Sequence, residues 1–222
     1  LILSDPNDLA VEALRSLRTS LHFAMMEASN KVLMVSGPSP GVGKSFVSAN
    51  LAAVLAQTGQ KVVVVDADMR KGHMHRFFEN RNDAGLSDYL SGQVEQSLIV
   101  QPTQMENLSF ISRGQVPPNP SELLMHDRFK ALMESLSDQY DIVLVDTPPI
   151  LAVTDAAIVG QLAGSSLIVT RFGVNSVKEV DITLTRFAQN NVEIKGAILN
   201  CMERRASNEY GYYAYEYGKS SE

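Results

Sequence analysis

An α/β fold, in which a parallel sheet is covered by helices on both faces, is predicted by three features of the sequence. Short, continuously apolar runs alternate with segments of helical periodicity along most of the 222 residues, as expected for buried parallel strands joined by helices. A glycine-rich loop separates the first apolar run from a helical segment. Aspartates follow two of the later apolar runs.

The bulk composition indicates one globular domain of ordinary polarity. Hydrophobic residues make up 45% and charged residues 20% of the chain, as in soluble proteins. The net charge of −6 gives no reason to expect nucleic acid or an anionic membrane as a partner. The single cysteine, Cys201, excludes a disulfide framework and favours a reducing compartment. No secretory signal is visible, and since the chain begins at Leu1 we expect a fragment with room for an anchor upstream.

The predicted elements of the first half begin with a helix. Ser4–Pro6 offers a capping side chain and a proline in the first turn, and leucines recur at helical spacing after it. Strands are expected at 32–35, 61–65 and 108–111. Helices are expected at 44–57, which Gly59 ends, and at 71–79 and 86–91.

The second half repeats the alternation after a stiff loop. Three prolines exclude regular structure from 113–120, and Ser121 is placed to cap a helix that runs to about residue 137. Strands are expected at 142–145, 166–171 and 194–199, and helices at 155–163 and 176–189. The prediction is therefore one domain over residues 1–206 and a disordered tail, rich in tyrosine, over residues 207–222.

The glycine-rich loop at 36–45 reads Ser-Gly-Pro-Ser-Pro-Gly-Val-Gly-Lys-Ser and has the composition of a phosphate-binding loop. Small residues let backbone N–H groups converge on phosphate oxygens beside a helix N-terminus. Lys44 would reach the β- and γ-phosphates, and the Ser45 hydroxyl would hold Mg²⁺. Pro38 stands where the strict pattern has glycine, so the match is a variant. It predicts a P-loop NTPase-type fold, with nucleotide contacts from Gly41, Val42, Gly43, Lys44, Ser45 and Phe46.

Three aspartates complete the predicted site. Asp66 and Asp68 follow the strand at 62–65, and Asp146 follows the strand at 142–145. Ligands of open α/β sheets lie beyond the carboxyl ends of the strands, so these carboxylates should face the phosphate loop. Asp146 suits attachment to Mg²⁺ through water, while Asp66 or Asp68 would bind the metal or accept a proton from an attacking hydroxyl. The candidate metal ligands are Ser45, Asp66, Asp68 and Asp146, and the candidate catalytic residues are Lys44 and the three aspartates.

Five of the seven tyrosines lie together near the C-terminus, at Tyr210, Tyr212, Tyr213, Tyr215 and Tyr217. A sticky aromatic tail, an edge strand and a stacking platform for single-stranded nucleic acid are alternatives. The platform would need interleaved basic residues, and only Lys219 is basic between 207 and 222. The remaining hypothesis is a set of phosphate acceptors, each of which would gain roughly −1.5 to −2 of charge.

A charged stripe lies on the predicted first helix. Glu12, Arg15 and Arg18 follow at intervals of three residues and share one side of a helix. The stripe is either a solvated face with a weak internal pair or a contact with another subunit.

Taken together, these motifs resemble those of the bacterial tyrosine kinases, specifically the cytosolic domain of the Wzc-like capsule and exopolysaccharide kinases. The phosphate loop is accompanied by Val-Asp-Ala-Asp-Met-Arg at 65–70 and Val-Leu-Val-Asp-Thr-Pro-Pro at 143–149. The proline-rich segment 113–124, Glu-x-x-Arg-x-x-Arg at 12–18 and the tyrosine cluster complete the set. The resemblance covers essentially the whole chain.

The resemblance implies a protein tyrosine kinase that uses ATP and Mg²⁺. Lys44 and Ser45 would be its Walker A residues, Asp66 and Asp68 its Walker A′ residues, and Asp146 its Walker B aspartate. It further implies a homo-oligomeric ring formed through Glu12, Arg15 and Arg18, and phosphorylation of the tail by a neighbouring subunit. The implied partners and setting are a membrane-spanning, periplasmic co-polymerase module upstream, a cognate phosphotyrosine phosphatase, polysaccharide export and the cytoplasmic face of the bacterial inner membrane.

The chain departs from the family pattern at one position. His73 stands where Wzc-like kinases often carry a regulatory tyrosine, which leaves Arg113 without that partner and favours a surface role for His73.

Two other functions compete with the kinase hypothesis. The first is an ATPase of the MinD/ParA class, which shares the fold but has a signature lysine early in the loop, where this chain has Ser39. The second is a nucleotide-gated assembly module that performs no phosphotransfer and uses its tail only as a tether that binds a partner.

Overall fold

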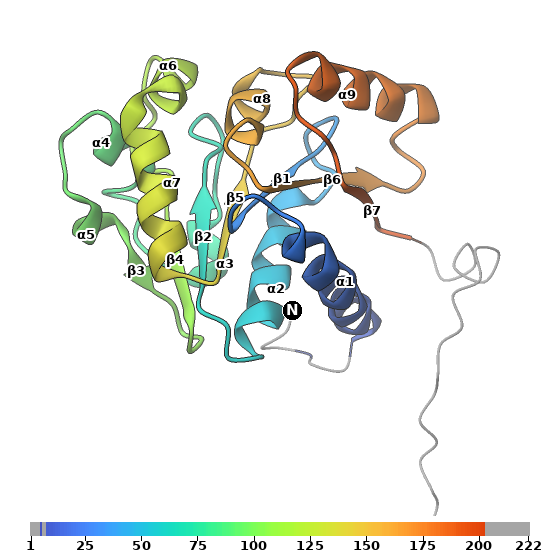
Figure 1. Cartoon of the computed structure of the whole chain (residues 1–222), viewed down its shortest axis with the longest axis horizontal. Helices are drawn as coiled ribbons and strands as arrows, with labels where there is room; N and C mark the ends of the chain where they lie inside the picture. The colour runs from blue at the N-terminus through green and yellow to red at the C-terminus, as the bar shows by residue number, and fades with distance from the viewer. Residues whose placement is uncertain (1–4, 6–7, 203–222) are drawn as a thin grey trace, which may run out of the picture.

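The computed structural model describes residue 5 and residues 8–202, and its centre is a seven-stranded sheet (Figure 1). The strands lie in the order β3-β4-β2-β5-β1-β6-β7. Every neighbouring pair is parallel except β3 and β4, which are antiparallel. The strands are β1 (Val32–Ser36), β2 (Val62–Asp66), β3 (Gln101–Pro102), β4 (Leu108–Ile111), β5 (Ile142–Asp146), β6 (Ser165–Arg171) and β7 (Gly196–Asn200). The predicted α/β class and its parallel core are confirmed.

The central strands are apolar throughout because both faces of the sheet are covered. Successive side chains of a strand point to opposite faces, so Leu33 and Val35 of β1 join one buried cluster. Val32 and Met34 join the cluster on the other face. All five residues of β1, and likewise of β2 and β5, are buried.

Helices α1 (Leu9–Met26), α2 (Lys44–Ala56) and α3 (His75–Phe78) cover the first face. Helix α1 begins later than predicted, because the Asp8 carboxylate accepts a hydrogen bond from Ala10 N at 2.7 Å and caps the helix. Of the predicted start, Ser4 and Pro6 lie outside the described residues. Val11, Leu14 and Leu21 of α1 are buried against α2.

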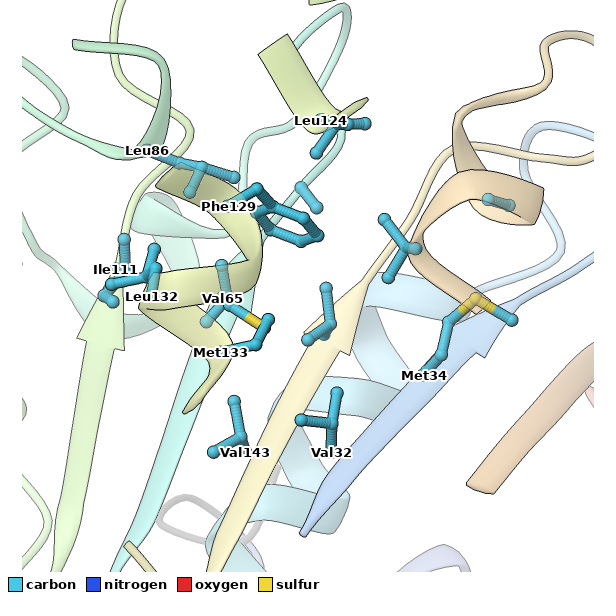
Figure 2. Close-up of a cluster of buried hydrophobic side chains, with 14 of the residues drawn as sticks. Val32, Met34, Val65, Leu86, Ile111, Leu124, Phe129, Leu132, Met133 and Val143 are labelled. Carbon is cyan, nitrogen blue, oxygen red and sulfur yellow. The ribbon is translucent and has the colours of Figure 1, made fainter. Parts of the chain in front are cut away.

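The second face carries the remaining helices, and its buried centre is drawn in Figure 2. Phe129 of α7 is fully buried there, and Figure 2 shows it among Leu86, Leu124 and Val65. These helices are α4 (Leu86–Leu90), α5 (Gln96–Ile99), α6 (Pro120–Met125), α7 (Asp127–Gln139), α8 (Asp155–Gly160) and α9 (Val177–Gln189).

The single helix predicted from Ser121 is wrong, since the segment forms α6 and α7. His126 between them has an extended backbone (φ −72°, ψ 145°), and its side chain accepts from Arg128 N, which caps α7. Helix α6 itself begins at Pro120, and its N-cap residue is Asn119, so the predicted cap at Ser121 is wrong. The Ser121 hydroxyl lies inside the helix and donates to Asp155 Oδ1 instead. Histidine is not among the residues that favour this cap position, so the break carried no sequence signal.

The helix predicted at 71–79 is reduced to α3. Upstream of it, carboxylates take the backbone N–H groups that a helix would use: Asp68 accepts from Arg70 and Lys71, and Asp66 accepts from Met74. Local bonds of this kind compete with helix formation. Helix α8 also ends earlier than predicted, at Gly160, and α5 and β3 were not predicted.

Two further observations bear on the predicted organisation. Among the described residues, no helix combines the length and apolar character that crossing a bilayer requires. The predicted boundary between a domain at 1–206 and a tail at 207–222 lies outside the described residues and stays a prediction.

Replacing Phe129 by alanine should remove the central side chain of the second face. We expect Phe129→Ala to lower the free energy of unfolding by about 3–5 kcal/mol, the usual cost of a large core truncation. Leu98→Ala is the control, because Leu98 is 65% exposed and its loss should cost less than about 0.5 kcal/mol. Urea unfolding measures both, and equal effects would contradict this packing.

Candidate active site

The carboxyl ends of β1, β2 and β5 meet at one edge of the sheet. Val35 of β1 and Asp66 of β2 are both register partners of Asp146 on β5. The phosphate loop leaves β1 at this edge and leads into α2. The parallel order of the strands thus brings together the loop and the aspartates that the sequence predicted to meet.

The loop ends in a helix whose first N–H groups have no helical partner. Gly41 and Gly43 have positive φ angles of 78° and 94°, a conformation that favours glycine. Val47 N donates to Gly43 O at 2.9 Å and closes the first turn of α2. The N–H groups of Lys44, Ser45 and Phe46 therefore remain at the helix N-terminus, where they and the helix dipole favour an anion.

Helix α2 also delivers the polar side chains that surround Asp146. Ser45 Oγ donates to Asp146 Oδ2 at 2.7 Å, and Ser48 Oγ donates to Asp146 Oδ1 at 2.9 Å. Burial raises the pKa of Asp146 despite the opposing effects of the Lys44 charge and the two serines. Ser48 was missed from the sequence, although a serine one turn after Lys44 in an apolar helix is a usable signal.

Asp66 is the most enclosed of the three aspartates. It is fully buried, its Oδ1 accepts from Asp68 N at 3.2 Å, and its Oδ2 accepts from Met74 N at 3.1 Å. A Cβ atom on Gly72 would lie 2.3 Å from Asp66 Oδ1, so only glycine fits there. Burial, and then the charge of Asp146, raise the pKa of Asp66 well above its ordinary value.

Asp68 is placed differently, since it is only partly buried. Its Oδ1 accepts from Arg70 N at 3.2 Å and Lys71 N at 2.9 Å. Within the described part of the chain, no donor bonds its Oδ2. Asp68 is therefore the carboxylate with an oxygen available to a ligand.

Arg70 connects the segment after β2 to α8 on the second face of the sheet, a contact that is not predicted from the sequence. Its guanidinium bonds both oxygens of Asp155, at 3.0 and 3.1 Å, and Ser121 Oγ at 3.0 Å. Asp155 is fully buried. Its hydrogen bond raises the pKa of Arg70, which therefore stays charged.

The donor set fits Mg²⁺ rather than a softer ion. Serine hydroxyl and carboxylate oxygens are the hard ligands that Mg²⁺ takes, usually with several waters and phosphate oxygens. Burial is the main reason that the pKa of Asp66 and the pKa of Asp146 are raised, and a neighbouring carboxylate adds to each shift, Asp146 at Asp66 and Asp68 at Asp146. A cation would stabilise the charged form of these carboxylates. Among the described residues, no three His, Cys, Asp or Glu side chains form a complete cage, so such an ion would rely on Ser45, water and phosphate.

The other predicted residues lie apart from this edge. Glu12 and Arg15 form an ion pair within α1, and Arg18 lines a surface hollow of about 490 Å³ beside the C-terminal half of that helix. His73 is exposed with its ring near Phe77, while Arg113 Nε donates to Gly72 O at 2.7 Å. The predicted phosphate acceptors lie outside the described residues: Tyr210, Tyr212, Tyr213, Tyr215 and Tyr217.

Comparison with known proteins identifies the family. A family model described as an AAA domain matches residues 30–195. The kinase domain of the Escherichia coli tyrosine kinase ETK has a structure with a TM-score of 0.90 and 53% sequence identity, covering 98% of this chain and 84% of that one. The chain belongs to the bacterial tyrosine kinase family. This confirms the resemblance and the nucleotide-binding P-loop fold.

Two other matches set the limits of the comparison. The tyrosine-protein kinase wzc of Salmonella typhimurium is 56% identical over 223 aligned residues, which cover 100% of this chain and 31% of that protein. The chain thus spans about a third of the length of this curated relative. The cell division ATPase MinD of Pyrococcus furiosus has a TM-score of 0.66 at 21% identity, covering 82% of this chain and 79% of that one, and shares the fold alone.

The raised pKa of Asp66 leads to a prediction about how stability depends on pH, measured in EDTA so that no divalent cation binds the carboxylates. A carboxyl whose pKa is higher in the folded state favours folding at low pH, and that contribution is lost as the pH rises above about 4. Asp66→Asn should lose one of the two backbone hydrogen bonds at every pH, because an amide NH2 cannot accept. Its stability relative to the parent should nevertheless rise between pH 4 and pH 8, by about 1–2 kcal/mol. Urea unfolding at several pH values measures the difference.

Asp138→Asn is the matched control, because Asp138 is an exposed carboxylate of α7. Its stability relative to the parent should not change with pH by more than about 0.5 kcal/mol. A difference for Asp66→Asn that stays flat or falls with rising pH would contradict the electrostatic account.

Proposed function

We propose that this domain is an ATP-dependent protein tyrosine autokinase that phosphorylates the tyrosine cluster at 210–217. The observation that carries the proposal is the meeting of the Lys44–Ser45 loop end with Asp146, where Ser45 Oγ lies 2.7 Å from the carboxylate, in a chain of the tyrosine kinase family. The position of β7 also supports it. This strand is the last one that the structure describes before the tyrosines, and it ends beside the phosphate loop, where Asn200 Nδ2 donates to Val42 O.

The loop and the start of α2 bind and orient ATP in this proposal. The N–H groups of residues 41–46 bind phosphate oxygens, and the buried Lys44 bridges the β- and γ-phosphates. Mg²⁺, when held by Ser45 and through water by Asp146, with Asp66 and Asp68 nearby, would neutralise charge on the transferring phosphoryl group. Most of the catalysis is then positioning and electrostatic stabilisation.

Asp68 is the better candidate for the base. Both oxygens of Asp66 accept backbone hydrogen bonds and the side chain is fully buried, whereas Asp68 is partly exposed. A tyrosine hydroxyl would give its proton to Asp68 as its oxygen attacks the γ-phosphorus, and the bond from that phosphorus to the bridging oxygen would break to release ADP.

The alternatives explain less of the chain. Ser39 replaces the signature lysine of MinD/ParA ATPases, and its Oγ accepts from Asn175 Nδ2 at 3.0 Å. That class gives the five tail tyrosines no role, and an assembly module without phosphotransfer would use the tail only as a tether that binds a partner. We further propose that the domain is part of a longer protein at the cytoplasmic face of the bacterial inner membrane. There a co-polymerase module, a ring of subunits and a phosphotyrosine phosphatase would link phosphorylation to polysaccharide polymerisation and export.

Incubation with Mg-ATP should produce phosphotyrosine in the tail. Lys44→Met removes the charge at the phosphates and should abolish transfer, while Asp68→Asn should slow it by about 10²- to 10⁴-fold with ADP binding retained. Mass spectrometry maps the modified tyrosines. An unmodified tail, or equal modification in Lys44→Met, would refute the kinase.

Mixing separates transfer between subunits from transfer within one. Lys44→Met protein supplies a tail, and active protein that lacks residues 207–222 supplies the site. We expect the Lys44→Met tail to become phosphorylated, and no transfer in the mixture would restrict the reaction to a subunit's own tail.

Arg15→Ala/Arg18→Ala tests the proposed ring. Removing both cations of the α1 stripe should convert the assembly to a monomer, because charged contacts between subunits would be left unpaired. Light scattering measures the mass. Lys130→Ala is the control, since Lys130 also pairs with a glutamate on an exposed helix face, and an unchanged assembly in the double variant would exclude this role of α1.

A further inference from the structure

Two side chains at the ends of the last two strands of the sheet donate hydrogen bonds to carbonyl oxygens of the phosphate loop. Arg171 ends β6, and its Nη1 donates to the carbonyl oxygen of Gly41 at 3.2 Å. Asn200 ends β7, and its Nδ2 donates to the carbonyl oxygen of Val42 at 2.9 Å. Both contacts are made to consecutive peptide groups of the loop.

Fixing a carbonyl also fixes the N–H group of the next residue. In a trans peptide the two groups point in opposite directions, and the described chain contains no cis peptide. The bond to Gly41 O thus directs the N–H of Val42 away from Arg171, and the bond to Val42 O directs the N–H of Gly43 away from Asn200. Within the described residues, neither N–H donates to a protein acceptor.

The main chain that carries each of the two side chains is itself held in place. Asn175 Oδ1 accepts from the main-chain N of Arg171 at 2.8 Å, while its Nδ2 donates to Ser39 Oγ at 3.0 Å. The main-chain oxygen of Asn200 accepts from Phe172 N at 2.9 Å. A Cβ atom on Gly43 would lie 2.2 Å from Asn200 Nδ2, so the amide packs directly on the loop.

The loop needs such support because of its glycines. Gly41 and Gly43 both have positive φ angles, and glycine populates positive and negative φ about equally. Its peptide groups can therefore rotate at low cost and turn a carbonyl oxygen toward a bound phosphate. An oxygen in that place would repel the phosphate instead of binding it.

We propose that Arg171 and Asn200 are positioning residues for phosphate binding. By holding the carbonyls of Gly41 and Val42 outward, they keep the N–H groups of Val42 and Gly43 directed at the phosphates. The inference rests on the proposed nucleotide binding at this loop, and it assigns the two side chains to the phosphates rather than to the base or ribose.

Calorimetric titration with two probes tests this role. Mg-ADP contains base, ribose and phosphates, whereas inorganic tripolyphosphate with Mg²⁺ contains phosphates alone. We expect Arg171→Ala and Asn200→Ala each to weaken binding of both probes about 5- to 10-fold, as for one lost hydrogen bond near a charged ligand. Arg171→Lys keeps a donor and should recover part of the affinity.

A matched variant controls for general damage. Arg186→Ala removes an exposed arginine of α9. It should bind the two probes within about twofold of the parent, an effect below that of one hydrogen bond. The thermal midpoint of each variant should lie within a few degrees of that of the parent, because each loses at most the free energy of about one hydrogen bond.

Three outcomes would overturn the inference. Weaker Mg-ADP binding with unchanged tripolyphosphate binding would assign the side chains to the base or ribose, and unchanged binding of both probes would exclude the role. A parent that binds neither probe would refute nucleotide binding at the loop, and the inference with it. Tyrosine phosphorylation is not used, so a failure of the kinase proposal alone would leave the result clear.

Discussion

Two buried carboxylates at the ends of adjacent strands are the constraint on which the rest of the site depends. Asp66 and Asp146 are register partners on β2 and β5, and burial raises the pKa of both. Burying a carboxylate is unfavourable unless its oxygens accept hydrogen bonds, and here every one of the four oxygens does. Ser45 and Ser48 donate to Asp146, and two backbone N–H groups donate to Asp66. These same bonds tie α2 and the 68–74 segment to one edge of the sheet.

The features that the sequence predicts well are those fixed by neighbouring residues. Val62–Val65 is β-branched throughout and forms β2 as expected, with Asp66 added because its backbone still pairs with β5. The meeting of the phosphate loop with Asp66 and Asp146 also follows from sequence, since parallel strands present their carboxyl ends at one edge. Local pattern and sheet geometry together were sufficient for the centre of the candidate site.

The features that could not be predicted depend on residues far apart in the chain. Arg70 meets Asp155 across 85 positions, and Asn200 meets Val42 across 158, and no local spacing indicates either pair. The helix expected at 71–79 failed for a related reason, because Asp66 takes the N–H of Met74. In these places a single long-range or side-chain contact outweighs helix propensity, which is a weak term for any one residue.

The end of β7 connects the loop to the proposed substrate. Asn200 touches the loop, so the chain that carries the tyrosines leaves from the edge where the γ-phosphate would lie. The 17 residues from 201 to 217 span at most ~55 Å when extended, enough for its own site or a neighbour's. The length of the tail therefore does not decide which subunit's active site it enters, and the arrangement of the subunits must decide it. In the proposed reaction each phosphate would add roughly −1.5 to −2 of charge to the tail. The three aspartates would repel a modified tail that entered the site, so the site would favour unmodified tails.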